Sequence, residues 1–162
     1  MKGTMDPLRE EHRELRPHVD QLGELADLLD ERRGDVPMAG LEAATAFLRD
    51  RLLRHAAAEE AALYPAVGQA LGAPEATATM ARDHLEIRGM IERLEALVGA
   101  ARAGRADVRA LQRVLYGLQA ILGLHFAKEE EVYVPLLEER LAPHDVAGLL
   151  ARLEAAADSR SR

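Results

Sequence analysis

Apolar residues recur every three or four positions through four long stretches of the chain, the period that places side chains on one face of an α-helix. The stretches cover about residues 6–32, 38–70 and 74–102, and a fourth follows the capping candidate Asp107 and extends to about residue 139. Asp6 and Pro7 are expected to cap and open the first helix. Breaks are expected at RRGDVP, at LGAPE and around Gly104. Pro143 opens a fifth, shorter helix over about residues 143–157, and the final DSRSR is expected to fray.

Four long amphipathic helices joined by short turns predict an all-α fold, an up-down-up-down four-helix bundle with a short C-terminal fifth helix. The composition agrees, because 48% of the residues are hydrophobic but only 3% are aromatic, as in packed helices rather than sheets. A chain of 162 residues is long enough for one sizeable core. We therefore expect residues 1–162 to form a single domain, with the bundle over about 6–139 and the short helix over about 143–157.

Polar residues interrupt the apolar face of each long helix. His55 and Glu59 repeat seventy residues later as His125 and Glu129, so the spacing HxxxE occurs twice. One turn of helix separates residues four apart, so each pair presents an imidazole and a carboxylate on the same face. The first and third helices carry His12 and His84 in the related contexts HRELR and HLEIR. Such a repeated spacing is typical of a metal site.

The turn positions predict that these histidines meet. His12 lies 22 residues before Gly34 and His55 lies 21 residues after it, so equal rises along antiparallel helices bring them level. His84 and His125 are placed in the same way about Gly104, at 20 and 21 residues. All four imidazoles are therefore expected at one end of the bundle.

Burying these polar groups together would leave donors and charges unpaired unless cations sit among them, although a metal-free polar network stays open. The chain has no cysteine, so only imidazole and carboxylate are offered, which leaves iron, manganese and zinc. Two carboxylates that each bridge would favour a pair of six-coordinate iron ions joined by an oxo or hydroxo bridge, with one position open on each ion. The predicted metal ligands are His12, His55, Glu59, His84, His125 and Glu129.

The order H, HxxxE, H and HxxxE on four helices resembles the hemerythrin-like HHE cation-binding family, over about residues 6–139. The ExxH motif of ferritin-like di-iron bundles is missing, because Arg, Leu, Ala and Leu stand three residues before the four histidines. The resemblance implies a non-haem di-iron centre, in preference to zinc or manganese, with the four histidines as nitrogen ligands. It also implies that Glu59 and Glu129 are the bridging carboxylates.

The chain departs from oxygen-carrying hemerythrins at two places. Those proteins have a fifth histidine four residues after the third-helix histidine, where Arg88 stands here. Their last-helix carboxylate is an aspartate five residues after its histidine, whereas this chain has Glu129 at four and Glu130 at five. Tyr133, Glu60 and Glu130 are further candidates to complete the coordination, while Tyr64 is expected to pack in the core.

We expect a protein that binds dioxygen or a related small oxidant for storage or sensing. One alternative is an enzyme that decomposes hydrogen peroxide, as a catalase does, or handles nitric oxide, which the missing fifth histidine favours by leaving another labile position. Another is a bundle whose metal ions only stabilise the fold. The net charge of −7 and the absence of a basic block disfavour nucleic acid, and no apolar stretch is long enough for a membrane span. A cytoplasmic location and a possible homodimer complete these expectations.

Overall fold

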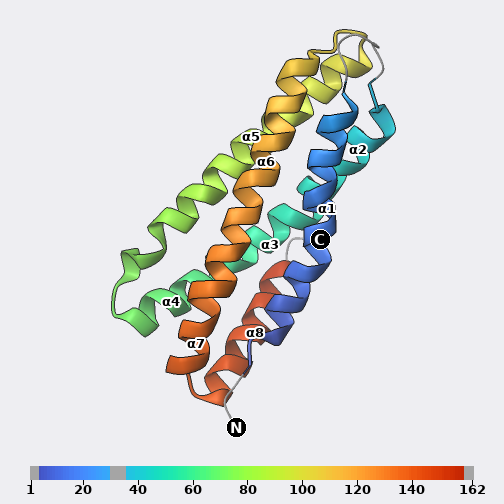
Figure 1. Ribbon diagram of the computed structural model, residues 1–162. Coiled ribbons are helices and arrows are strands. Elements are labelled where there is room, and N and C mark those ends of the chain that lie inside the picture. Colours follow the sequence, from blue (N-terminus) through green and yellow to red (C-terminus); the bar gives the residue numbers. More distant parts are fainter. Residues whose placement is uncertain (1–3, 30–35, 159–162) are drawn as a thin grey trace.

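The computed structural model describes residues 4–29 and 36–158, and within these ranges it contains helices and no strands (Figure 1). The helices form five rods, in which η marks a 3₁₀ or π turn. The rods are α1 (Asp6–Leu28); α2 (Met38–Phe47), η1 (Leu48–Leu52), α3 (Leu53–Ala58), η2 (Glu59–Leu63) and α4 (Tyr64–Leu71); η3 (Pro74–Thr77) and α5 (Ala78–Arg102); α6 (Val108–Lys128), η4 (Glu129–Tyr133) and α7 (Val134–Arg140); and α8 (Pro143–Asp158). The all-helical prediction is confirmed, whereas the predicted end of the first helix, most of RRGDVP and most of DSRSR lie outside the described residues.

The rods begin and end for local reasons. Asp107 caps α6, because its carboxylate accepts a hydrogen bond from the backbone N–H of Ala110 at 2.9 Å. Gly72 and Gly104 end α4 and α5 with φ angles of 64° and 73°, a left-handed conformation that favours glycine. The predicted cap at Asp6 is wrong by one residue, since Asp6 is the first residue of α1 and its carboxylate pairs with Arg9 instead.

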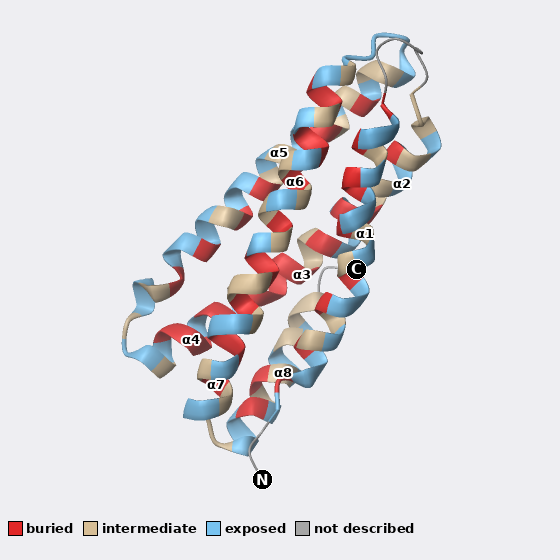
Figure 2. Ribbon diagram, viewed as in Figure 1, coloured by how far each residue is buried: buried red, intermediate tan, exposed pale blue. Residues whose placement is uncertain are grey.

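The four long rods form a bundle in which α1 and α5 each pack against both α2 and α6. The fifth rod, α8, packs against α3 and η2 along the lower half of the bundle (Figure 1). Buried positions face the space between the rods, and exposed positions face outward (Figure 2). None of the described helices combines the length and the hydropathy that a membrane crossing requires.

The apolar interior consists of two clusters. One contains residues of α1, α2, η1, α5 and α6, among them Leu22, Leu48 and Leu118. The other contains residues of α4, α7 and α8, among them Val67 and Leu149. The buried polar residues are His12, His55, Glu59, Thr77, His84, His125 and Glu129. Because α8 supplies part of the second cluster, the histidines and glutamates lie between two apolar layers rather than at a bare end of the bundle.

Two π turns occupy equivalent places in the second and fourth rods. One begins at Glu59 and the other at Glu129. One residue separates the end of each turn from a proline, Pro65 in the second rod and Pro135 in the fourth. Proline has no backbone N–H, so the regular i→i−4 pattern is interrupted there. In each rod the residue before the proline donates its backbone N–H to the carbonyl five positions back. Tyr64 donates to Glu59, and Val134 donates to Glu129. A π turn thus precedes each proline, and the helix continues beyond both prolines as α4 and α7.

The wider turn shifts the buried face by one position. The apolar period of the fourth stretch places Val132 on the same face as His125 and Glu129, but Val132 is 56% exposed, while Tyr133 and Val134 are buried. The expectation for Val132 was wrong because it extended the α-helical period through a stretch that is wound more loosely.

Candidate metal centre

All six predicted ligand residues come together in the interior between the two apolar clusters, each with at most 3% of its surface exposed. Four different rods supply the imidazoles, and the two carboxylates stand at the first positions of the π turns. The residues are His12 on α1, His55 on α3, Glu59 on η2, His84 on α5, His125 on α6 and Glu129 on η4. The sequence-based expectation that these side chains meet is therefore confirmed, whereas their role as ligands is a proposal.

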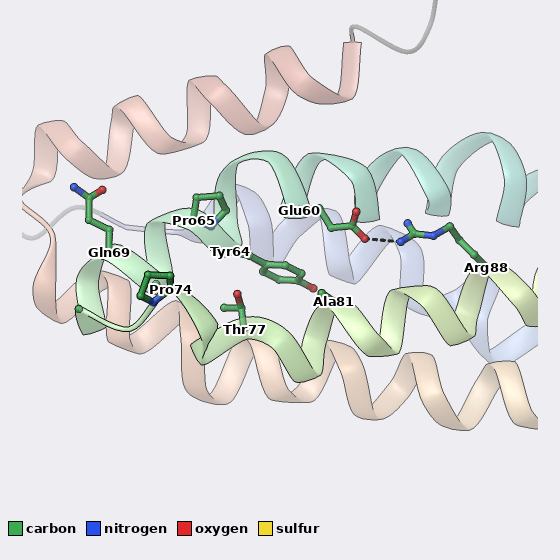
Figure 3. Close-up of a pocket in the computed structure, with 10 residues that line it drawn as sticks. Glu60, Tyr64, Pro65, Gln69, Pro74, Thr77, Ala81 and Arg88 are labelled. Carbon is green, nitrogen blue, oxygen red and sulfur yellow. Dashed lines mark hydrogen bonds and ion pairs between the residues drawn. The ribbon is translucent and has the colours of Figure 1, made fainter.

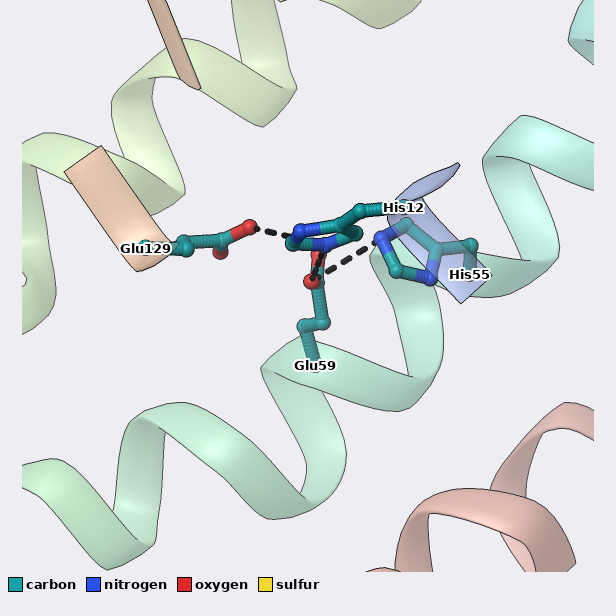
Figure 4. Close-up of side chains that lie close together, drawn as sticks. All are labelled: His12, His55, Glu59 and Glu129. Atoms are coloured by element: carbon teal, nitrogen blue, oxygen red, sulfur yellow. Dashed lines mark ion pairs between the residues drawn. The ribbon is translucent and has the colours of Figure 1, made fainter. Parts of the chain in front are cut away.

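Glu59 lies among all four imidazoles, and Figure 4 shows it beside His12 and His55. Its Oε1 is 3.0 Å from Nε2 of His55 and 3.6 Å from Nε2 of His12. Its Oε2 is 3.4 Å from Nε2 of His84 and 4.0 Å from Nε2 of His125. One carboxylate thus offers one oxygen to each of two histidine pairs, which is the arrangement that a carboxylate shared by two cations requires.

Glu129 closes the cluster from the opposite rod. Its Oε2 lies 3.5 Å from Nε2 of His12, and its Oε1 lies 3.4 Å from Nε2 of His125. Two groups of atoms therefore lie close enough to hold an ion, each with all its ligand atoms within 4.8 Å of one another. The larger group is His12, His55, Glu59 and Glu129, and the smaller is Glu59, His84 and His125.

Five inward-facing atoms have no hydrogen-bond partner. They are Nε2 of His12, Nε2 of His55, both carboxylate oxygens of Glu59 and Oε2 of Glu129. A buried polar atom without a partner costs about 1–3 kcal/mol, and a charged one costs more. Cations among these atoms would satisfy all five, and imidazole nitrogen with carboxylate oxygen is a donor set that suits iron, manganese or zinc. The residues present therefore fit a metal centre.

Every imidazole of the centre is held from behind by a second carboxylate. The distances to the outer nitrogen Nδ1 are 3.0 Å for His12–Glu130, 3.1 Å for His55–Glu11, 2.9 Å for His84–Glu60 and 3.2 Å for His125–Asp83. A carboxylate at Nδ1 places the proton there and leaves Nε2 free to bind an ion. The four outer carboxylates therefore orient all four rings toward the same point.

The outer carboxylates follow the internal repeat of the chain. Glu60 and Glu130, which were considered as direct ligands, each come one residue after an inner glutamate and instead bond a histidine of another rod. Glu11 and Asp83 were not singled out in the sequence, although each comes directly before an inner histidine. That acidic neighbour is the signal by which they could have been found.

Basic side chains in turn neutralise three of these carboxylates. Arg16 lies 3.1 Å from Glu130, Arg88 lies 2.9 Å from Glu60, and Lys128 pairs with Asp83. Arg88 occupies the sequence position of the fifth histidine of oxygen-carrying hemerythrins. Its guanidinium supports Glu60 and through it His84, so it lies outside the centre.

Tyr64 is the residue of the centre that sequence reasoning missed. Its hydroxyl donates a hydrogen bond to Oε1 of Glu129 at 3.0 Å and lies 3.2 Å from Nε2 of His84 and 3.3 Å from Nε2 of His125. In contrast, the hydroxyl of Tyr133, considered as a ligand, donates to the backbone carbonyl of Ala76 at 3.3 Å. Tyr64 follows its glutamate by five residues, the interval that a π turn brings back to the same face.

Burial and neighbouring charges set the proton positions of the metal-free cluster. Burial raises the pKa of Tyr64, and the negative charges of Glu59 and Glu129 raise it further, so the phenol keeps its proton. Burial also raises the pKa of Glu129, with Glu59 adding to the effect. Burial alone would also raise the pKa of Glu59, but the charge of His55 and the contacts with His12, His125 and His55 together outweigh burial and hold that pKa well below its ordinary range.

His55 and His125 are held protonated when no ion is present. Burial lowers the pKa of His125, but Glu129 and Glu59 outweigh it and raise that pKa from 6.5 to about 10. The pKa of His55 is likewise raised well above 6.5, because Glu59 and Glu11 outweigh burial. Protons therefore occupy the positions that cations would take, and metal binding must release them.

We expect the metal-free protein to lose stability as the pH rises from 6.5 to about 10. A histidine with a raised pKa in the folded state contributes stability that is complete below the unfolded value of 6.5 and is lost as the pH approaches about 10. Urea unfolding of chelator-treated protein at several pH values between these limits measures the effect, and His125→Asn should flatten the slope. A free energy of unfolding that increases across the interval would contradict the assignment.

Comparison with known proteins gives one family. The sequence model described as the hemerythrin HHE cation binding domain matches residues 4–137 and also residues 82–161. The first range contains all six inner residues of the centre. Neither the comparison with curated proteins nor the comparison with solved structures gave a significant match.

Proposed function

This chain belongs to the hemerythrin HHE cation binding domain family, and we propose that its buried cluster holds two iron ions that bind dioxygen or a related small oxidant for storage or sensing. The observation that carries the proposal is the position of Glu59, whose two oxygens face two separate pairs of imidazoles. A single ion would leave one of the two imidazole pairs, and the Glu59 oxygen that faces it, without a cation. A pair of ions accounts for both oxygens and for the five atoms without hydrogen-bond partners.

In this proposal His12 and His55 hold one ion, His84 and His125 hold the other, and Glu59 is shared. Glu129 joins the first group through Oε2. Iron bound there would supply a redox-active ion with positions left for a small exogenous ligand. We prefer iron to zinc and manganese because the paired site with shared carboxylates matches the family resemblance.

The other residues have roles that their contacts support. Phe126 stacks on His12 with ring centroids 4.5 Å apart and, being buried, helps to exclude water from that side. Tyr64 holds a proton beside His84 and His125, where a bound oxidant would need a hydrogen-bond donor. The outer carboxylates keep each ring in its binding tautomer.

A second function, decomposition of hydrogen peroxide or handling of nitric oxide, is favoured by the difference in the number of ligands between the two groups. The group around His84 and His125 has three members, whereas the group around His12 has four. Because Arg88 lies outside the centre, its position supplies no fifth imidazole to the smaller group. The ion held there would have more exchangeable positions, which is what turnover of peroxide requires.

We also infer that the four long rods alternate in direction, up-down-up-down. This order is supported by the packing of α1 and α5 against the same two neighbours, α2 and α6. It is supported further by the equal residue counts from the histidines to the turns, which bring the six polar side chains level.

Metal analysis of the purified protein, followed by exposure of the anaerobically reduced protein to oxygen, tests the proposal. We expect two iron ions per chain and a change in the visible spectrum that reverses under vacuum. Oxygen evolution from added hydrogen peroxide, without a reversible oxygen spectrum, would support the enzyme instead. Bound metal that responds to neither oxidant would leave a structural role for the ions, and chelator-treated protein is the control throughout.

A further inference from the structure

An open pocket of about 890 Å³ lies between α4 and the beginning of α5 (Figure 3). Its wall is mostly apolar and includes Tyr64, Gly68 and Ala81, and its only charged residues are Glu60 and Arg88, which pair with each other. This volume lies within the range of small-molecule sites in proteins.

One aromatic ring separates the pocket from the centre. Tyr64 lines the pocket and is 5% exposed, while its hydroxyl lies 3.0–3.3 Å from inner atoms of Glu129, His84 and His125. A molecule in the pocket would therefore meet the ring of Tyr64 and, past its edge, the side of the centre with fewer ligands.

The internal repeat shows that this opening is not a general feature of the bundle. Positions in the second rod correspond to positions 70 residues later, and positions near His12 correspond to positions 72 residues later. By this correspondence Gly68 matches Glu138, Ala81 matches Arg9, and Thr77 matches Met5.

At the corresponding place between α7 and α1, larger side chains meet across the space. The guanidinium of Arg9 pairs with both carboxylate oxygens of Glu138 at 2.6 and 2.9 Å. The backbone N–H of Met5 donates to Glu138 at 2.8 Å, and the Met5 side chain is fully buried. The counterpart of Tyr64 there is Val134, which has no polar atom to offer. Small residues therefore leave a pocket between α4 and α5, whereas the Arg9–Glu138 ion pair occupies the corresponding place between α7 and α1. Only the first of these two places is open toward the centre.

A second pocket, of about 610 Å³, touches the centre from a different direction. It is lined by α8 together with His55 and Glu11. Glu11 bonds Nδ1 of His55 at 3.1 Å, so the side of the ring near Glu11 is the outer one. This pocket therefore meets the outer carboxylate, whereas the pocket at Tyr64 adjoins a residue that contacts the inner atoms.

We propose that the pocket between α4 and α5 is the entrance and docking site through which small uncharged molecules reach the His84 and His125 side of the centre, with Tyr64 as its inner wall. Uncharged molecules are favoured because the pocket wall is mostly apolar and the one ion pair among its lining residues is already neutral. The inference rests on the proposed function for its purpose but can be tested without metal.

The first experiment uses Tyr64 as its own reporter. The chain has three tyrosines and no tryptophan, so Tyr116→Phe with Tyr133→Phe leaves Tyr64 as the only emitter at long excitation wavelengths. Quenching by acrylamide, a small neutral molecule, is then measured on metal-free protein. Ala81→Phe should lower the quenching constant several-fold, and Ala96→Phe, which adds the same ring at another exposed position of α5, should leave it unchanged.

Equal quenching in the two variants, with the helical circular dichroism signal retained, would overturn the entrance. Ala81→Leu repeats the test with a smaller obstruction, and should Ala81→Phe fail to fold, it carries the test alone. Gly68 is left unchanged, because an added Cβ would lie 3.1 Å from the Cα of Pro74 and would disturb the backbone.

The second experiment measures how fast oxygen changes the spectrum of reduced, iron-loaded protein in a stopped-flow instrument. We expect Ala81→Phe to slow this rate several-fold at unchanged iron content, and Ala96→Phe not to. An unchanged rate in Ala81→Phe would contradict the entrance. If no variant responds to oxygen while acrylamide still separates Ala81→Phe from Ala96→Phe, the proposed function fails and the entrance stands.

Discussion

Glu59→Gln is expected to prevent the binding of both proposed metal ions, although it replaces a single heavy atom of one side chain. Each oxygen of Glu59 faces one pair of imidazoles, so the loss of charge and of one oxygen ligand weakens both binding groups at once. We expect the affinity to fall by more than about 100-fold, which corresponds to about 2.7 kcal/mol. Iron content after dialysis and titration of the metal-free protein with ferrous ion measure the effect.

Glu60→Gln is the matched control, because it makes the same change at the next residue of the chain. Glu60 bonds the outer nitrogen of His84 at 2.9 Å and does not face the inner atoms. Outer partners of this kind change metal affinity by about 10–100-fold, so this variant should bind more weakly but still take up two ions. If Glu59→Gln retained two ions at full affinity, or if the two variants were equally impaired, Glu59 would not be the shared ligand.

Removal of the proposed metal ions is expected to lower the midpoint of thermal unfolding by at least about 8–16 °C, which is the contribution of one ion. An ion present at about a thousand times its dissociation constant stabilises the folded state by about 4 kcal/mol. For chains of this length 1 kcal/mol corresponds to about 2–4 °C. The physical reason is that five inward-facing atoms lose the ions that satisfy them, and protons replace the cations only in part.

Calorimetry or circular dichroism melts of the iron-loaded protein, with and without a chelator, measure this shift. Glu59→Gln supplies the control, since a protein that binds no metal should melt at the same temperature in both conditions. A chelator that removes the iron without moving the midpoint would show that the ions contribute nothing to the fold.

Much of the centre could be predicted because it depends on local geometry. The pairs His55–Glu59 and His125–Glu129 share a helix face wherever their helices lie, since an interval of four residues is one turn of a rigid rod. The counts to the turns then place His12 and His84 at the same level. The capping role of Asp107 was equally local, and it is confirmed.

Other parts depend on the exact winding of the helix, which the apolar period does not reveal. The π turns at Glu59 and Glu129 bring Tyr64 to the centre and turn Tyr133 toward the carbonyl of Ala76. From the sequence, Tyr133 was a candidate to complete the coordination and Tyr64 was expected to pack in the core. A proline shortly after each glutamate was visible in the sequence, but whether it kinks, ends or widens a helix depends on the neighbours that satisfy the freed carbonyl.

The amino-acid sequence by itself determined the helical class, the family and the six residues that meet in the interior, because intervals along a helix fix which side chains share a face. Only the tertiary structure decided which carboxylate stands behind each imidazole, that Tyr64 faces the centre, and that one side has a pocket where the other has an ion pair. These features depend on contacts between rods. Such contacts are set by distances of a few ångströms across the bundle, and no interval along a single helix encodes them.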